Sequence, residues 1–321
     1  MDRVIYDYYS NIEAKSVDWL WFPYIPFGKL TVIQGDPGEG KSTFVINLLS
    51  LLTKGLPMPD GFVPGHSYTA IYQCAEDGIA DTIKPRLEQA GADCSKVAYI
   101  ADSDVVLTLE DGRIESAIKE TGARVFVIDP IQAFIPPDSD MQSATKMRSI
   151  LRKLANTASK YNCAVILVGH MNKGNGSKNL YRGLGSIDIA AIARSVLMIS
   201  RDEFRPGMRY MYPIKSSLAP EGPAIGFTFK DGGGLAWHGC YDLNTSDLID
   251  SVTVKTSKRE CAKAKMIQML ESEDRPGTEI YEALASMGIG RRTVEKVKKD
   301  LQITGYRSGG VSYWSLPKHQ E

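Results

Sequence analysis

Residues 35–42 place three glycines, a lysine and a serine in the spacing G-x-x-x-x-G-K-S. The apolar run Leu30–Ile33 precedes this segment and apolar positions with helical spacing come after it, which is the strand–loop–helix context of a phosphate-binding loop. The glycines let successive backbone N–H groups point at phosphate oxygens, and the next helix adds its positive N-terminus. We therefore predict that this loop binds the phosphates of a nucleoside triphosphate and is not an ordinary glycine-rich turn.

Two side chains of the loop carry groups that suit phosphate and metal binding. Lys41 is expected to reach the β- and γ-phosphates, and the Ser42 hydroxyl is expected to ligate Mg²⁺. The predicted nucleotide-binding residues are Gly35, Asp36, Pro37, Gly38, Glu39, Gly40, Lys41, Ser42 and Thr43.

Two carboxylates come after apolar runs that are typical of strands. Asp129 ends the run Val125–Asp129 and is predicted to hold Mg²⁺ together with Ser42, the alternative being a cap for the next turn. Glu76 lies beyond the predicted strand 68–73 and is the candidate base that polarises the attacking water. Its neighbour Asp77 is expected to cap the helix that starts near residue 80.

A histidine and a basic loop come after the apolar run 164–169. His170 is predicted to contact the γ-phosphate, the alternative being a structural histidine. The next loop is basic, carries one tyrosine and is rich in glycine and asparagine, which suits single-stranded DNA. A solvated surface loop is the alternative. The candidate DNA contacts there are Lys173, Lys178 and Arg182.

These residues require a sheet whose strands end at one edge. Short apolar runs alternate with helical patterns, which predicts an α/β fold with a buried, mostly parallel sheet. Two later runs without a helix between them, 209–215 and 225–229, predict an antiparallel extension. The predicted strands are Leu30–Gln34, Tyr68–Gln73, Val97–Ile100, Val125–Asp129, Ala164–Val168 and Ser195–Ile199. The predicted helices are Lys41–Leu52, Ala80–Ala90, Arg113–Thr121 and Ala144–Tyr161.

The pattern changes after residue 240. We predict a lead-in segment at 1–28, an ATPase domain at 29–240, a linker at 241–257 and a winged helix-turn-helix at 258–321. The last domain is predicted to have three helices and a hairpin, with Thr278 capping the second helix. Residues 255–321 hold 13 Lys and Arg against 9 Asp and Glu, although the whole chain has 38 of each. Arg291, Arg292 and Lys296 of the third helix are candidate DNA contacts; a solvated face or a protein contact is the alternative.

Composition narrows the class of protein further. None of the apolar runs in the 321 residues approaches the ~20 needed to span a membrane, and the N-terminus lacks the pattern of a secretory signal. The five cysteines are scattered without a C-x-x-C pair, and the four histidines show no zinc spacing. A cytoplasmic protein without structural zinc is expected.

Taken together, these motifs resemble the RecA-like ATPases of the RepA/DnaB hexameric helicase group, specifically the RepA type of plasmids, phages and integrated elements. The resemblance covers nearly the whole chain. The segments that carry it are the Trp-rich lead 17–30, Cys74-Ala75-Glu76-Asp77, 128–134, Gly169-His170-Met171-Asn172-Lys173, 288–294 and Trp314-Ser315-Leu316-Pro317.

The resemblance implies that ATP binds between subunits of a ring, usually a hexamer, with a neighbour supplying positive charge. Arg194 matches the arginine finger of the RepA type, and Lys215 matches the lysine that acts in trans. Ser217 stands where the DnaB-type K-x-R pattern has arginine, so the resemblance favours Arg194 as the arginine finger. A plain surface arginine is the alternative for Arg194.

The predicted function is Mg²⁺-dependent ATP hydrolysis coupled to movement on DNA in replication of a mobile element, with an initiator or replication protein as a possible partner. A DNA-binding regulator or loader that uses ATP only as a switch is the alternative. A small-molecule kinase is a more distant one, since it leaves the basic tail unexplained.

Overall fold

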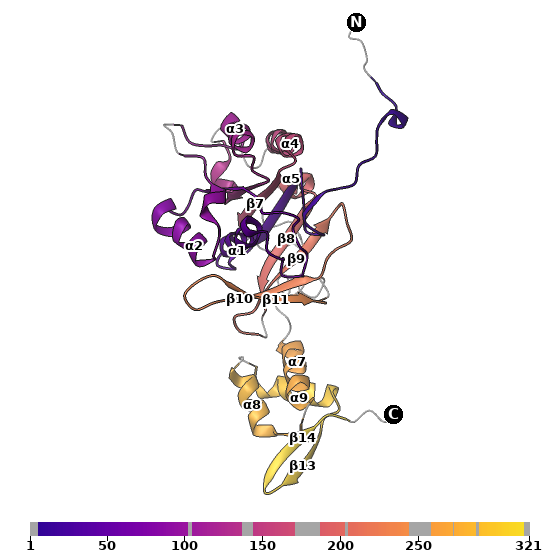
Figure 1. The fold of residues 1–321 in the computed structure, drawn as a ribbon. Helices are drawn as coiled ribbons and strands as arrows, with labels where there is room; N and C mark the ends of the chain where they lie inside the picture. Colours follow the sequence, from indigo (N-terminus) through magenta and orange to yellow (C-terminus); the bar gives the residue numbers. More distant parts are fainter. Residues whose placement is uncertain are drawn as a thin grey trace. The chain divides into compact units, whose positions relative to one another are not determined.

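The computed structural model describes residues 6–101, 105–136, 144–170, 187–202, 205–243, 258–271, 273–286 and 289–317. The chain divides into two compact units, one of residues 1–201 and 207–243 and the other of residues 202–206 and 244–321. Figure 1 shows the elements of each unit.

The first unit is built on a nine-stranded sheet in the order β11-β10-β9-β8-β3-β7-β6-β4-β5. The strands from β8 to β5 in this order are parallel, and β9, β10 and β11 extend the sheet in antiparallel fashion. The strands are β3 (Leu30–Gly35), β4 (Ala70–Cys74), β5 (Val97–Ala98), β6 (Val125–Asp129), β7 (Ala164–His170), β8 (Ser195–Arg201), β9 (Arg209–Ser216), β10 (Ala224–Phe229) and β11 (Leu235–Tyr241).

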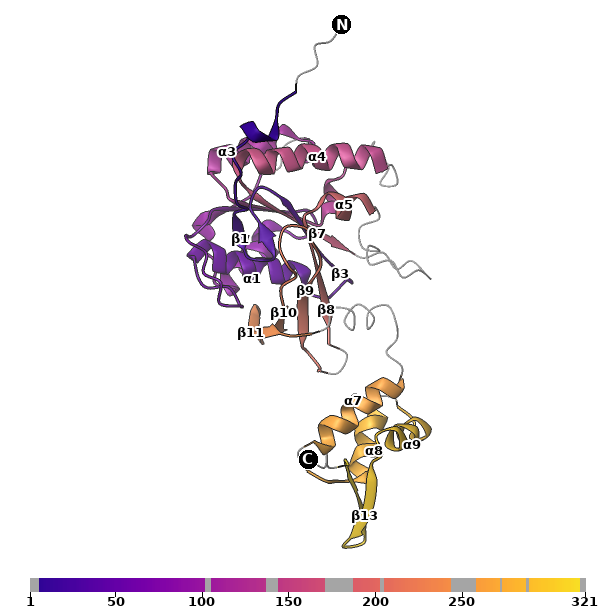
Figure 2. The same cartoon turned by 90° about the vertical axis from the view of Figure 1, so that its right-hand side faces the viewer.

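Helices cover both faces of this sheet, with α1 and α4 on opposite sides (Figure 2). Alternate strand residues such as Ile33 and Val127 pack with apolar residues of α1 and α2, whereas Val32 and Phe126, their neighbours in sequence, are buried outside that cluster. Burial on both faces explains the nearly continuous apolar runs of the strands. The helices are α1 (Lys41–Lys54), α2 (Lys84–Gln89) preceded by the π-helical turn η2 (Ile79–Ile83), α3 (Gly112–Thr121), α4 (Ala144–Tyr161) and α5 (Ile187–Ile192), with 3-10 turns η1 (Tyr9–Asn11), η3 (Cys94–Lys96) and η4 (Ile131–Phe134).

The Trp-rich lead forms a small hairpin of β1 (Trp19–Trp21) and β2 (Ile25–Pro26). Trp21 is fully buried in the same core as α1, and its indole N–H donates to Asp60 at 3.0 Å. The Tyr24 hydroxyl donates to the Pro223 carbonyl at 2.7 Å, so the lead is fastened to the strand region that precedes β10.

The second unit contains three helices and a three-stranded antiparallel sheet in the order β12-β14-β13. Its core is formed by Met266, Ile280, Val294, Val297 and Trp314 together with other buried apolar residues. Its elements are α7 (Lys258–Leu270), β12 (Arg275–Pro276), α8 (Gly277–Ser286), α9 (Arg291–Asp300), β13 (Thr304–Ser308) and β14 (Val311–Ser315).

The α/β class and the mostly parallel sheet are confirmed, and all six predicted strands of the alternating region are present. The prediction for Thr278 was wrong, because α8 already begins at Gly277 and Thr278 therefore lies inside its first turn. Sequence patterns missed β11, α5 and the two-residue strand β12. No helix among the described residues has both the length and the apolar content to cross a bilayer.

Candidate active site

Four adjacent strands end at one edge of the sheet and collect the candidate residues there. β3 lies beside β7, β7 beside β6 and β6 beside β4, all parallel. In this register Gly35 is opposite His170, and Asp129 is opposite Cys74, two residues before Glu76. The phosphate-binding loop, His170, Asp129 and Glu76 therefore meet where open α/β sheets bind ligands.

The loop has the backbone conformation that its glycines allow. Gly38 and Gly40 have φ of +79° and +89°, in the left-handed region that favours glycine. Lys41 is 4% exposed, and its ammonium donates to the carbonyls of Gly35 at 2.8 Å and Asp36 at 2.9 Å. Burial lowers the pKa of Lys41, opposed by nearby carboxylates of which Asp129 is the strongest. A bound polyphosphate would replace these carbonyl contacts with stronger charge-assisted ones.

Asp129 is 3% exposed and sits between two hydroxyl groups. The Tyr72 hydroxyl donates to its carboxylate at 2.8 Å, and Ser42 hydrogen-bonds the same carboxylate. Burial raises the pKa of Asp129, and the two hydrogen bonds oppose that rise. Mg²⁺ is commonly held by one or two protein oxygens together with waters and substrate phosphates. The adjacent Ser42 and Asp129 oxygens fit such a site.

Glu76 and His170 approach each other across this edge. Glu76 Oε2 lies 3.7 Å from His170 Nε2, and the Glu76 side chain is 61% exposed. His170 Nδ1 is buried and has no hydrogen-bond partner among the described residues, which do not include 171–186. Asp77 does not cap the next helix, because its carboxylate pairs with Arg86 at 2.6 Å and the helix begins after Gly78 without a side-chain cap. Of the two neighbouring carboxylates, Glu76 is the one that faces His170.

Sequence reasoning missed the residues that cover the loop from the antiparallel side. Arg201 at the end of β8 pairs with Glu39 at 3.0 Å and donates to the Gly38 carbonyl at 3.1 Å. The Phe229 ring lies against Gly40, since a Cβ at that position would come within 2.4 Å of the ring. Arg209 stacks on Phe229 at 4.1 Å. These contacts follow from the order of the strands in the sheet, because β8, β9 and β10, which supply the residues, carry no sequence motif.

Arg194 and Lys215 lie at the opposite edge of the sheet. Arg194 immediately precedes β8, and its N–H donates to the carbonyl of Leu30, the first residue of β3. β3 has six residues, so this edge is about 20 Å from the chain's own phosphate-binding loop. The Lys215 ammonium donates to the carbonyls of Ala190, Ala191 and Ala193 and thereby caps the C-terminal end of α5. Within one chain, Lys215 is thus engaged structurally and the exposed Arg194 is not near the loop.

The candidate DNA contacts fall into two groups. Lys173, Lys178 and Arg182 lie outside the described residues. The lysine and arginine side chains of α9 lie on two different faces of the helix. The Arg291 guanidinium lies 4.9 Å from the ring centre of Tyr281, and the Lys298 ammonium lies 3.9 Å from that of Trp314. The exposed face opposite the buried Val294 and Val297 carries Arg292, Lys296 and Lys299.

Comparisons with known proteins show a family for just over half of the chain. The family model described as an AAA domain matches residues 6–176, more than half of the chain. The DNA repair protein RadA of Bacillus subtilis (strain 168) is 27% identical over 148 residues, which are 46% of this chain and 28% of that protein. RadA of Streptococcus pyogenes serotype M3 (strain MGAS315) is 29% identical over 149 residues, with the same shares. The matched region thus spans less than a third of these curated relatives.

A solved structure shows the same fold. The ATPase domain of G40P superposes with a TM-score of 0.50 and 15% identity, covering 63% of this chain and 81% of that one. This fold, together with the match to the AAA domain family, makes the first unit a RecA-like P-loop ATPase core.

Proposed function

The chain belongs to the AAA domain family, and from this premise we propose that it is a Mg²⁺-dependent ATPase that works on DNA as a ring of identical subunits. In this proposal ATP hydrolysis drives translocation on, or unwinding of, DNA during replication of a mobile element. The similarity to DNA repair proteins supports a role on DNA.

One observation carries the hydrolytic part of the proposal. The loop, a buried carboxylate hydrogen-bonded to the loop serine, and an exposed glutamate 3.7 Å from a histidine meet at one sheet edge. A nucleotide-binding protein without hydrolysis needs the loop but not the exposed Glu76. We therefore assign Glu76 as the base that takes the proton of a water molecule attacking the γ-phosphorus, with ADP as the leaving group.

The other residues of the edge bind and orient. Loop amides and Lys41 hold the phosphates, while Ser42 and Asp129 would hold Mg²⁺, which neutralises phosphate charge when bound. The contact with Glu76 lets His170 respond to the terminal phosphate and orient the carboxylate. Tyr72 fixes the Asp129 carboxylate through its 2.8 Å hydrogen bond.

A second copy completes the site in this proposal. Arg194 is too far from its own loop to neutralise the γ-phosphate, since the two lie at opposite edges of the sheet. A head-to-tail contact would bring Arg194 of one copy to the loop of the next, and repeated contacts of this kind close into a ring.

The second unit contributes the duplex contact. The order α7-β12-α8-α9-β13-β14 supports the proposal that this unit is a winged helix-turn-helix, in which α9 would be the recognition helix. The loop with Lys173, Lys178 and Arg182 remains the proposed contact to a single strand inside the ring.

The substitution Glu76→Gln tests the assignment of the base. It keeps the size of the side chain and removes its basicity, so we expect a fall in turnover of about 10²–10⁴-fold with nucleotide binding unchanged. Steady-state phosphate release and equilibrium binding of a fluorescent ATP analogue measure the two effects. Asp77→Asn is the matched control and should leave turnover near the wild-type value. Unchanged turnover in the Gln variant would remove Glu76 from this role.

The rival function is a DNA-binding regulator or loader that ATP merely switches. A winged helix in the second unit would be compatible with this function, since many such domains serve regulators. A strand-displacement assay with forked DNA separates the two. Hydrolysis stimulated by single strands without displacement would favour the rival.

A further inference from the structure

A pocket lies on the α1 side of the sheet, between α1, the end of α2 and the turn that joins β10 to β11. We call it the hairpin pocket, and its volume is about 270 Å³. The part of α1 that lines it runs from Asn47 to Lys54, so the pocket is separate from the phosphate-binding loop at residues 35–42.

The three walls of the hairpin pocket are held together by the fold. The Asn47 side chain bridges two of them, since its Oδ1 accepts from the Leu235 N–H at 3.0 Å and its amide donates to the Thr43 carbonyl at 2.8 Å. A Cβ built on Gly233 would come within 2.5 Å of Gln89 Oε1, so the turn packs closely on the end of α2. A preformed pocket of this kind lowers the entropic cost of binding a ligand.

Apolar side chains that keep part of their surface open line the hairpin pocket. Leu56 is 44% exposed, and Leu51, Ala90 and Trp237 are half-buried. The last three also pack on the buried core around α1, which fixes their positions. The pocket therefore offers apolar contact area to a ligand in addition to hydrogen-bonding groups.

Two lysines add positive charge to the hairpin pocket. Lys54 in the last turn of α1 and Lys230 in the hairpin turn are both exposed. The Lys54 ammonium lies near Gly91, since a Cβ built there would come within 3.8 Å of it. Among the described residues, neither lysine has an ion pair and the lining contains no Asp or Glu. The charge of the pocket thus favours an anionic ligand.

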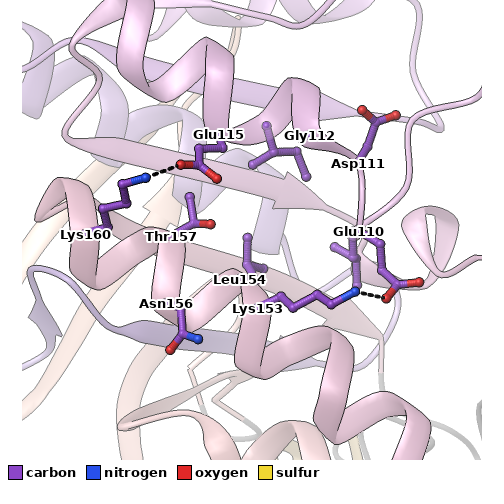
Figure 3. Close-up of a pocket in the computed structure, with 11 residues that line it drawn as sticks. Glu110, Asp111, Gly112, Glu115, Lys153, Leu154, Asn156, Thr157 and Lys160 are labelled. Atoms are coloured by element: carbon purple, nitrogen blue, oxygen red, sulfur yellow. Dashed lines mark hydrogen bonds and ion pairs between the residues drawn. The ribbon is translucent and has the colours of Figure 1, made fainter.

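The pocket between α3 and α4, which we call the α3–α4 pocket, has a different chemistry (Figure 3). Its lysines are already paired, Lys153 with Glu110 at 3.0 Å and Lys160 with Glu115 at 2.7 Å. Its apolar lining residues are at most 3% exposed. It combines neither unpaired charge nor open apolar surface, and therefore serves as a comparison for the hairpin pocket.

We propose that the hairpin pocket binds a short acidic peptide segment of a partner protein, with one large apolar side chain in the cavity and carboxylates beside Lys54 and Lys230. The volume lies below the roughly 300–1,000 Å³ of small-molecule sites, so it suits a single anchoring side chain. Side chains that fill such pockets supply most of the affinity of an interface, while charges at the rim guide the partner to it.

Nucleic acid fits this surface less well than an acidic peptide does. A single strand is bound along a positively charged groove with aromatic rings on which successive bases stack. The hairpin pocket instead has two cations beside the aliphatic Leu51 and Leu56. The proposed contact requires neither ring formation nor hydrolysis, so it goes beyond the proposed function and can be tested apart from it.

Selection from a phage-displayed library of random peptides on immobilised full-length protein tests the chemistry of the ligand. We expect the recovered peptides to place a large apolar residue beside several Asp or Glu. Recovery of peptides without this pattern, or of none above the unselected library, would overturn the proposal.

Fluorescence anisotropy of a recovered peptide then tests the place of binding. Lys54→Glu with Lys230→Glu turns two attractions into two repulsions and should raise the peptide Kd about tenfold or more. The matched control is Lys153→Glu with Lys160→Glu, which makes the same change in net charge at the α3–α4 pocket and should bind the peptide as wild type does. An equal loss in both variants would reduce the effect to net charge and contradict the proposal.

Leu56→Ser tests the apolar half of the pocket. Because Leu56 is 44% exposed, this variant should keep the wild-type thermal midpoint yet bind the peptide severalfold more weakly. Binding that depends on the two lysines but not on Leu56 would be purely ionic and would refute the anchor.

Two further measurements on the Lys54→Glu/Lys230→Glu variant identify other occupants. Weaker binding of a single-stranded oligonucleotide than in the control variant would make the surface a nucleic-acid contact, and lost self-association in sedimentation velocity would make the occupant a second copy. Either result overturns the proposal. Peptide binding as expected by a protein that does not hydrolyse ATP would uphold this inference while the proposed function fails.

Discussion

Duplex binding by α9 should depend on which face of the helix loses its charge. Arg292 and Lys296 lie on the face opposite the core, whereas Arg291 and Lys298 are drawn onto the rings of Tyr281 and Trp314. The double variants Arg292→Ala/Lys296→Ala and Arg291→Ala/Lys298→Ala each remove two positive charges. Net charge is therefore matched, and any difference between them reports geometry.

The expected magnitude comes from counterion release. Each phosphate neutralised on B-DNA contributes about −0.9 to the slope of log Kobs against log[salt]. Loss of both outward contacts should make the slope less negative by about 1.8. Over a fourfold rise in salt, the wild-type protein should then lose about 12-fold more affinity than this variant.

The measurement is fluorescence anisotropy of a labelled duplex with full-length protein at several salt concentrations, without nucleotide. The Arg291/Lys298 variant should keep the wild-type slope, because its two cations contact aromatic rings. It should instead lose about 0.5–1 kcal/mol of unfolding free energy per exposed cation–π pair. Equal slopes for the two variants, or a larger change in the second one, would refute the assignment of α9 as a recognition helix with this outward face.

Two further predictions concern the phosphate-binding loop and the buried carboxylate beside it. Gly40→Ala should lower the unfolding free energy by about 1–3 kcal/mol in denaturant titrations, because φ is +89° at this position and the new Cβ meets Phe229. Adding Phe229→Ala should recover only the steric part of this loss, and full recovery would contradict the argument from backbone strain. Asp129→Asn should raise the thermal midpoint at pH 7–8 and abolish hydrolysis. The pKa of Asp129 in the folded state lies above its unfolded value of 3.8, so stability falls as the pH rises through the interval between the two values. An Asn variant less stable than wild type at neutral pH would show that the ionised carboxylate supports the fold.

Most of the ATPase core could be predicted from the sequence, for reasons visible in particular residues. The loop motif specifies local backbone geometry, so Gly38 and Gly40 could be placed without knowledge of the fold. Asp129 and His170 could be placed because each lies directly after a run of buried residues, and strand ends share an edge in a parallel sheet. A local signal was sufficient wherever function depends on the residue at the end of a parallel strand.

The remaining contacts depend on neighbours distant in sequence. Phe229 covers Gly40 from 189 positions away, and Arg201 reaches Glu39 across the β8 side of the sheet. The order of antiparallel strands decides these contacts, and alternation of apolar residues does not encode that order. The contact of Tyr72 with Asp129 is also of this kind. Tyrosine is common in strands and carries no signal of its own, and Tyr72 reaches Asp129 because β4 lies beside β6.

The positions of Arg194 and the phosphate-binding loop constrain how copies can assemble. A twofold interface that included both sheet edges would complete two sites in a closed dimer, whereas a head-to-tail interface completes one site per contact and can close into a ring. This argument predicts complementation between two inactive variants, Lys41→Ala and Arg194→Ala. In a random mixture, a working site needs the loop of one variant and the arginine of the other, so roughly one quarter of wild-type activity should return. Each variant mixed with itself is the control. A mixture as inactive as its components, with mixed oligomers verified by mass spectrometry, would mean that Arg194 does not act on a neighbour's nucleotide.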